Sequence, residues 1–137
     1  MNTTTKTPSR IKVITGNAAA AIAAKLARPD VVAAYPITPQ TEVIEQIFTF
    51  HASGEMDCEL ITVEGENSAM NAVMAASLAG GRVFTASSSW GLVFMYDAVL
   101  AVAGARAPVV MVNVNRETPG IIAVSSGQQD MISTRDA

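Results

Sequence analysis

Two glutamates separated by one glycine lie where a short apolar run gives way to an alanine-rich stretch. The run 60–63 is followed by Glu64 and Glu66, and small residues then continue to Gly80. This pattern predicts a buried strand, a turn and a helix. Burying an unpaired carboxylate is costly, and a helix N-terminus favours negative charge but accounts for one acid more readily than for two. The two acids are therefore either a helix-capping pair or part of a ligand site.

Three further apolar runs have the length of buried strands, and each is followed by side chains that could bind a polar ligand. These side chains are Thr38 after 31–35, Ser87 and Ser88 after 83–86, and Arg116 after 108–112. The carboxyl ends of parallel strands meet at one edge of a sheet, where open α/β sheets bind ligands. A guanidinium there suits a carboxylate or a phosphate. Two alternatives remain open, namely helix capping by the hydroxyl groups and a surface ion pair between Arg116 and an acidic neighbour such as Glu117 or Asp130.

Helical patterns separate these runs. Helices are predicted over about 17–27, 41–51, 68–78 and 92–103, with Asn17 capping the first and Thr38 or Thr41 capping the second. The segment 11–14 is a possible additional strand, and 118–137 shows little pattern. Strands that alternate with helices predict a doubly wound α/β fold, with a mostly parallel sheet and helices on both faces.

Composition excludes several functional classes. Of 137 residues half are apolar, and the net charge is −3 without a basic patch, which argues against nucleic acid as a partner. Cys58 is the only cysteine, which excludes an internal disulfide and a CxxC motif, and it is interpreted as a buried thiol. His51 is interpreted as a solvated helix end. No transmembrane run or signal peptide is recognised, and a cytoplasmic location is expected. No GxGxxG or P-loop motif occurs.

Five short blocks occur in a fixed order along the chain. They are TGN at 15–17, YPITPQT at 35–41, EGENSAM at 64–70, TASSSWGL at 85–92 and VNVNR at 112–116. Together they resemble the N-terminal domain of the α subunit of 2-oxoacid:ferredoxin oxidoreductases, the pyruvate synthase group. The resemblance covers residues 11–137, with 1–10 expected to be a flexible terminus and the domain expected to be truncated at its C-terminus.

The resemblance implies a thiamine diphosphate enzyme and assigns this domain to the half that binds the pyrimidine ring. By this resemblance Glu66 is the catalytic glutamate that hydrogen-bonds the aminopyrimidine, with Glu64 as the second choice. The resemblance also implies that Thr38 and Arg116 bind the substrate carboxylate. The expected cofactor-binding residues are Glu66, Pro36, Ser87 and Ser88.

Other parts of such an enzyme are not recognised in this sequence. There is no GDG…N pattern for magnesium and the diphosphate, and there are no cluster cysteines. No metal ligand is therefore predicted in this chain. The resemblance implies that Mg²⁺ and [4Fe-4S] clusters lie in partner subunits of a hetero-oligomer, with coenzyme A as co-substrate and ferredoxin or an NAD-linked acceptor taking the electrons. The alternative is a non-catalytic module that completes an interface of such a complex.

Two positions depart from the family pattern. Asn67 replaces the usual histidine of the acidic block, and the segment 127–130 reads Gly-Gln-Gln-Asp where the family has Asp-His-Ser-Asp. Amides in place of charged groups predict a larger substrate, such as the aryl 2-oxoacid phenylglyoxylate, rather than pyruvate.

Overall fold

A computed structural model describes residues 11–118 and 125–137 of the chain. The predicted flexible terminus, 1–10, lies outside the described residues. Within the described ranges, no helix is long and apolar enough to cross a membrane.

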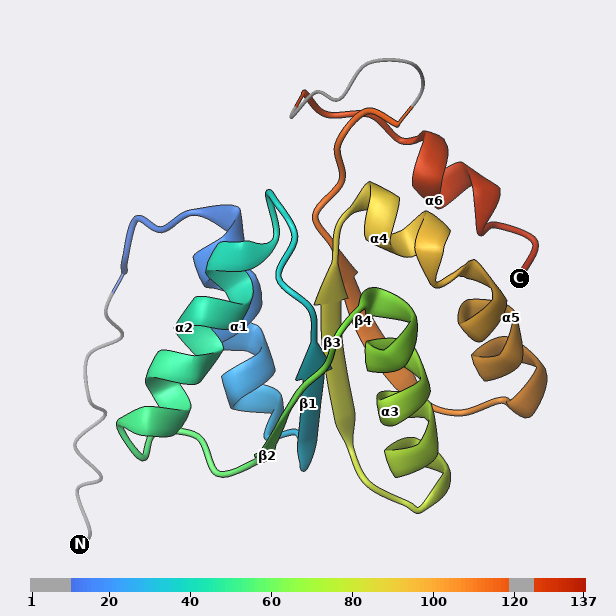
Figure 1. The fold of residues 1–137 in the computed structure, drawn as a ribbon. Coiled ribbons are helices and arrows are strands. Elements are labelled where there is room, and N and C mark those ends of the chain that lie inside the picture. The colour runs from blue at the N-terminus through green and yellow to red at the C-terminus, as the bar shows by residue number, and fades with distance from the viewer. Residues whose placement is uncertain (1–10, 119–124) are drawn as a thin grey trace, which may run out of the picture.

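Among residues 11–118 and 125–137, four parallel strands form the sheet, in the order β2-β1-β3-β4 (Figure 1). Their bounds are Val31–Ala34 for β1, Glu59–Thr62 for β2, Val83–Ser87 for β3 and Val109–Asn113 for β4. All four predicted strands that follow the first helix are present, each within two residues of its predicted bounds. The predicted doubly wound α/β fold is confirmed.

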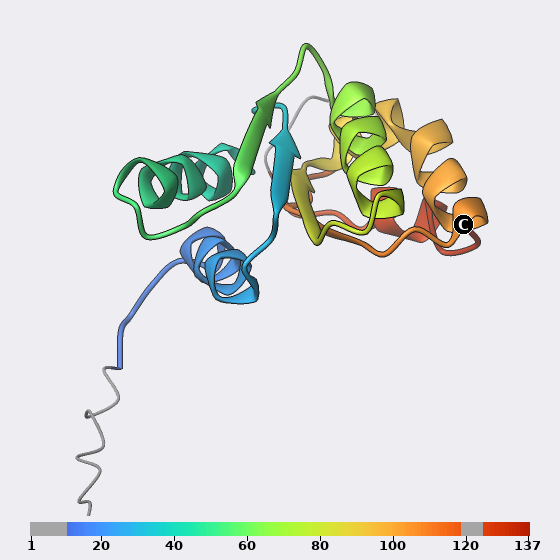
Figure 2. The same ribbon diagram turned by 90° about the horizontal axis from the view of Figure 1, so that it is seen from below.

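In the described part of the chain, six helices accompany the sheet. They are α1 (Gly16–Ala27), α2 (Thr41–Ala52), α3 (Glu66–Leu78), α4 (Ser89–Phe94), α5 (Tyr96–Ala105) and α6 (Gln129–Ser133). Figures 1 and 2 show α1 and α2 on one side of the sheet and α3 and α5 on the other. Helix α4 follows β3 directly, and α6 packs beside α4.

The central strands bury both of their faces. In β1, Val32 and Ala34 belong to the core beneath α1 and α2, whereas Ala33 between them belongs to the core beneath α3 and α5. In β3, Phe84 belongs to the core beneath α1 and α2, and Val83 belongs to the core beneath α3 and α5. Successive side chains of a strand point to opposite faces, so a strand covered on both sides needs a continuous apolar run. This is why the runs 31–35 and 83–86 lack alternation.

The strand order places a topological switch point between β1 and β3. The chain leaves the carboxyl end of β1 towards α2 on one face, and leaves the carboxyl end of β3 towards α4 on the other side (Figure 1). The connections diverge at this point, and open α/β sheets bind ligands at such topological switch points. The loops at 35–40 and 87–88 follow the two strands at this point.

Two predicted elements were wrong. The segment 11–14 is not a strand; Ile11 and Val13 are almost fully exposed, because no strand lies beside them to pair with. The single helix predicted over 92–103 is two helices, α4 and α5, joined at Met95. Met95 is fully buried in the core beneath α3, so the bend lets both helices pack around that side chain.

The predicted caps also differ from those observed. Thr15, not Asn17, caps α1 by accepting a hydrogen bond from the amide of Ala18 at 3.1 Å. Asn17 instead donates to the carbonyl of Pro39 at 2.9 Å, which links α1 to the loop before α2. Helix α2 has Gln40 at its N-cap and no side-chain cap, so neither Thr38 nor Thr41 caps it. Spacing alone could not distinguish a cap from a long-range hydrogen bond.

Cys58 and His51 lie where the sequence predicts. Cys58 is buried in the core beneath α1 and α2, and burial is the main cause that raises the pKa of its thiol. His51 is exposed in the last turn of α2.

The buried face of α2 can be tested with two adjacent residues. Ile47 is fully buried, whereas Phe48 next to it is 39% exposed. We expect Ile47→Ala to lower the free energy of unfolding by about 2–5 kcal/mol, because it leaves a cavity in the core. Phe48→Ala should cost clearly less. Urea unfolding measures both, and equal losses would contradict this assignment of the core.

Candidate functional site

Burial separates the two candidate glutamates. Glu66 is the first residue of α3 and is 8% exposed, whereas Glu64 is exposed. The hydroxyl of Ser68 donates to Glu64 Oε1 at 2.7 Å, and this hydrogen bond is the main cause that lowers the pKa of Glu64. Glu64 is thus the solvated acid of the pair, and Glu66 is the one that lies in the interior.

Glu66 lies directly against the start of α4. A Cβ atom added to Gly91 would lie 2.7 Å from Glu66 Cγ and 2.8 Å from Glu66 Oε1, and closer still to Ser87 Oγ. These separations are too short for a real side chain, so only glycine allows α4 to approach the glutamate this closely. The structure therefore brings together Glu66 and Ser87, from two different strand ends, around Gly91.

Several polar groups at this edge have no partner. Within residues 11–118 and 125–137, no hydrogen bond reaches the carboxylate of Glu66. Ser88 is fully buried, and its hydroxyl also lacks a partner there. It is the N-cap residue of α4 but makes no side-chain cap, so the capping alternative does not explain it. Buried polar groups in proteins nearly always have partners, so these groups are suited to a ligand.

Arg116 is anchored through its backbone. Its amide donates to Ser89 Oγ at 2.7 Å, and its carbonyl oxygen lies 2.6 Å from the same atom. Its side-chain Nε is buried without a partner among the described residues. Among the described residues, no ion pair joins the guanidinium to Glu117 or to Asp130; Glu117 accepts from Ser125, and Asp130 accepts from Ser89. The predicted alternative of a surface ion pair is therefore not observed.

Thr38 and Pro36 lie on another part of the same edge. Both are exposed, in the loop between β1 and α2. Thr38 lines a hollow of about 300 Å³ together with Asn17, Thr41 and Glu42. In the described part of the chain, no hydrogen bond joins Thr38 to Glu66 or to Arg116. The structure thus places Thr38 at the predicted edge without joining it to the other candidates.

The sequence reasoning missed three residues of this site. Gly91 and Ser89 belong to the block at 85–92 but received no individual role, and Asp130 was only a possible ion-pair partner of Arg116. Their contacts join segments 25 to 41 residues apart, such as Glu66 with Gly91 and Ser89 with Asp130. Local spacing carries no signal for contacts of this kind.

The described residues contain no group of three or more His, Cys, Asp or Glu side chains placed to hold a metal ion.

Comparison with known proteins identifies the family. A family model described as "Pyruvate flavodoxin/ferredoxin oxidoreductase, thiamine diP-bdg" matches residues 22–137. The chain belongs to this family. The resemblance stated from the five sequence blocks is thereby confirmed.

Relatives within this oxidoreductase family include two kinds of subunit. The pyruvate synthase subunit PorA of Methanothermobacter thermautotrophicus is 51% identical over 127 residues, which cover 93% of this chain and 33% of the relative. The ketoisovalerate oxidoreductase subunit VorA of Pyrococcus horikoshii is 54% identical over 125 residues, or 91% of this chain and 32% of the relative. The chain spans about a third of the length of these relatives.

A solved structure of the same oxidoreductase class supports the fold. The 2-oxoglutarate:ferredoxin oxidoreductase of Magnetococcus marinus, solved with 2-oxoglutarate, coenzyme A and succinyl-CoA bound, superposes with a TM-score of 0.71. The match has 31% sequence identity and covers 78% of this chain and 18% of that chain. The α/β sheet described above is thus the fold of a domain in that enzyme.

The close approach at Gly91 generates a test. We expect Gly91→Ala to destabilise the fold by about 1–3 kcal/mol, because the new methyl group would overlap Glu66 and Ser87. Gly104→Ala is the matched control, since an added Cβ there meets nothing within 4 Å and alanine favours the helix. Chemical unfolding of both variants measures the difference. A neutral Gly91→Ala would show that α4 does not lie against Glu66.

Proposed function

We propose that this chain is the pyrimidine-binding part of the α subunit of a thiamine diphosphate-dependent 2-oxoacid:ferredoxin oxidoreductase. The enzyme would oxidatively decarboxylate a 2-oxoacid to an acyl-CoA and pass the electrons to iron–sulfur clusters in partner subunits. Membership of the family and the names of the relatives support the reaction class. One observation carries the assignment of the site: Glu66 is only 8% exposed, its carboxylate accepts no hydrogen bond from the described residues, and it opens α3 at the carboxyl edge of the sheet.

The residues at this edge fit the pyrimidine end of thiamine diphosphate. A ring nitrogen needs a carboxyl group in a water-poor pocket, and Glu66 supplies one. Gly91 lets α4 pack directly against that carboxyl group, and the buried hydroxyl of Ser88 has no partner among the described residues and can bond a ligand. When bound, thiamine diphosphate supplies the electron sink for the electron pair released as carbon dioxide leaves the 2-oxoacid.

Glu66 would hold and move one proton. Its carboxyl oxygen would share a proton with the pyrimidine nitrogen, and packing of α4 against Glu66 would keep the group in that position. A carboxyl group that cannot rotate away and is shielded from water makes this hydrogen bond more effective. Ser87 and Ser88 would line the ring with hydroxyl groups, and Pro36 would contribute its rigid turn to the cofactor pocket.

Arg116 and Thr38 would orient the substrate. The guanidinium of Arg116 can bind the substrate carboxylate with two parallel hydrogen bonds, which fixes both the position and the direction of the 2-oxo group. The hydroxyl of Thr38 would add one hydrogen bond to the same carboxylate. Thr38 lies in the exposed loop that follows β1, at the same edge of the sheet as Arg116.

Other parts of the assembly would provide the remaining chemistry. We assign Mg²⁺ and the [4Fe-4S] clusters to partner subunits of a hetero-oligomer, coenzyme A to the acyl-accepting step, and ferredoxin or an NAD-linked acceptor to the end of the electron pathway. A cytoplasmic location belongs to the same proposal. Other subunits would complete the site, because Glu66 and Arg116 lie at an open edge of this domain.

The substrate belongs to the 2-oxoacids, and the hypothesis of an aryl substrate gains no support. The named relatives are subunits for pyruvate and ketoisovalerate. The side chains of Gln128 and Gln129 are exposed, and Asp130 is engaged by Ser89.

Comparing turnover of pyruvate, ketoisovalerate, 2-oxoglutarate and phenylglyoxylate by the assembled complex distinguishes the substrates. We expect an aliphatic 2-oxoacid to be preferred, and a preference for phenylglyoxylate would contradict this.

The central test replaces Glu66 by glutamine in the assembled complex. Glutamine has nearly the same shape but cannot share the proton, so we expect turnover to fall by at least about 100-fold. Glu64→Gln is the control, because Glu64 is exposed and should leave turnover near the normal value. Steady-state assays with a 2-oxoacid, coenzyme A and an electron acceptor measure both variants. Unchanged turnover in Glu66→Gln would favour the non-catalytic interface module instead.

A further inference from the structure

A buried carboxylate that the proposed reaction does not use lies behind Arg116. Asp130, in α6, is 1% exposed. Its Oδ2 accepts hydrogen bonds from Ser89 Oγ at 2.7 Å and from Asn113 Nδ2, and its Oδ1 accepts one from the amide of Met131 at 2.8 Å. Three donors offset the cost of burying this group. These contacts hold together α6, the end of β4 and the first turn of α4.

Ser89 connects this carboxylate to Arg116. Its hydroxyl oxygen accepts the Arg116 amide proton and lies within hydrogen-bond distance of both the Arg116 carbonyl and Asp130. A hydroxyl group has one proton and two acceptor sites, so it accepts from the amide and donates to one of the two oxygens. The Arg116 amide is therefore held by the Ser89 hydroxyl, whose single proton is shared between the Arg116 carbonyl and Asp130 Oδ2, the two acceptors within its reach.

The guanidinium of Arg116 depends on this anchor. Its Nε is buried without a partner, and no carboxylate of the described residues lies within ion-pair distance of it. The position of the Arg116 backbone therefore determines the point from which its side chain extends. Asn113 ties Asp130 to the strand that leads into Arg116, so the same carboxylate also holds the chain three residues earlier.

We propose that Asp130 is a positioning residue for Arg116 and acts through Ser89 and Asn113. The inference rests on the proposed function, because it takes Arg116 to bind the substrate carboxylate. Ser89 begins α4, and Gly91 of the same helix lies against Glu66. Asp130 thus fixes the substrate-binding guanidinium relative to the cofactor-binding carboxyl group, although it touches neither substrate nor cofactor.

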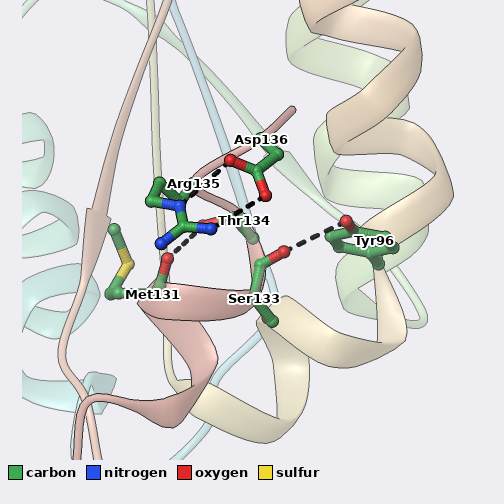
Figure 3. A network of polar contacts seen from close by, with 6 residues as sticks. All are labelled: Tyr96, Met131, Ser133, Thr134, Arg135 and Asp136. Atoms are coloured by element: carbon green, nitrogen blue, oxygen red, sulfur yellow. Dashed lines mark hydrogen bonds and ion pairs between the residues drawn. The ribbon is translucent and has the colours of Figure 1, made fainter.

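The test is Asp130→Asn in the assembled complex loaded with thiamine diphosphate. Asparagine keeps the shape of the aspartate side chain but replaces one of its acceptor oxygens by an NH₂ group. That group would then face the donors that bind Asp130, namely Ser89, Asn113 or the Met131 amide. We expect KM for the 2-oxoacid to rise on the order of 10-fold, with kcat changed less and the affinity for thiamine diphosphate within about twofold. Asp136→Asn is the matched control, because Asp136 is exposed and pairs only with the adjacent Arg135 among the described residues (Figure 3); no change is expected.

A second variant and a double-mutant cycle separate positioning from general stability. Ser89→Ala removes the bridge without disturbing the charge at Asp130, and it decides the question if Asp130→Asn does not fold. Asp130→Asn is also combined with Arg116→Ala. If Asp130 acts through Arg116, its effect on KM disappears in the Arg116→Ala background, because the two changes remove one interaction.

The outcomes distinguish this inference from the proposed function. If Arg116→Ala raises KM while Asp130→Asn and Ser89→Ala do not, the inference is overturned and the proposed function stands. An equal effect of Asp130→Asn with and without Arg116 also overturns it, as does a lower melting temperature without a change in KM. If Arg116→Ala itself leaves KM unchanged, the proposed substrate site fails, and this inference fails with it.

Discussion

The arrangement of the site depends on the close contact between Glu66 and Gly91. A carboxyl group with little exposed surface needs a partner, and the described residues offer it none. The group stays in the interior because it opens α3 at a helix N-terminus, where backbone amides favour negative charge, and because α4 covers it. Any side chain larger than hydrogen at position 91 would separate the two helices. A buried acid and a glycine 25 residues away therefore form one structural unit.

The sheet explains why this contact lies at a ligand-binding edge. The central strands β1 and β3 are parallel neighbours, but the chain leaves them towards opposite faces. Their connections diverge at the carboxyl ends, which makes this edge a topological switch point. Glu66 follows β2 and Arg116 follows β4, and both contact the first turn of α4, through Gly91 and Ser89 respectively. The fold alone is compatible with many functions; family membership and the buried acid select among them.

Hydrogen bonds between side chains and backbone hold the segments around Arg116 in addition to the apolar core. Ser89 holds the backbone of Arg116 and bonds a buried carboxylate, and α6 is further attached through the hydroxyl of Tyr96, which donates to the carbonyl of Ser133 at 3.1 Å (Figure 3). Helix α6 is thus attached to α4 and α5 through hydrogen bonds, whereas its apolar side chains Met131 and Ile132 remain largely exposed. Such bonds are directional, so they are better suited to fixing one side chain than to supplying stability.

The sequence by itself determined the strand-helix alternation, the parallel sheet and the residues at the carboxyl edge. These features follow from local patterns: continuous apolar runs at 31–35 and 83–86, and polar residues immediately after them. The family was also recognisable, because five blocks kept their order. The possible strand at 11–14 was wrong, since an apolar run becomes a strand only beside a neighbour with which it can pair.

Only the tertiary structure decided which acid is buried and what holds Arg116. Glu64 and Glu66 are two residues apart with the same chemistry, and burial depends on α4, which the local sequence does not show. The same holds for Ser89 and Asp130, whose hydrogen bond spans 41 residues. Spacing predicts where a strand or helix begins, but the partner of a buried polar group is set by packing of distant segments. That packing is a property of the folded chain as a whole.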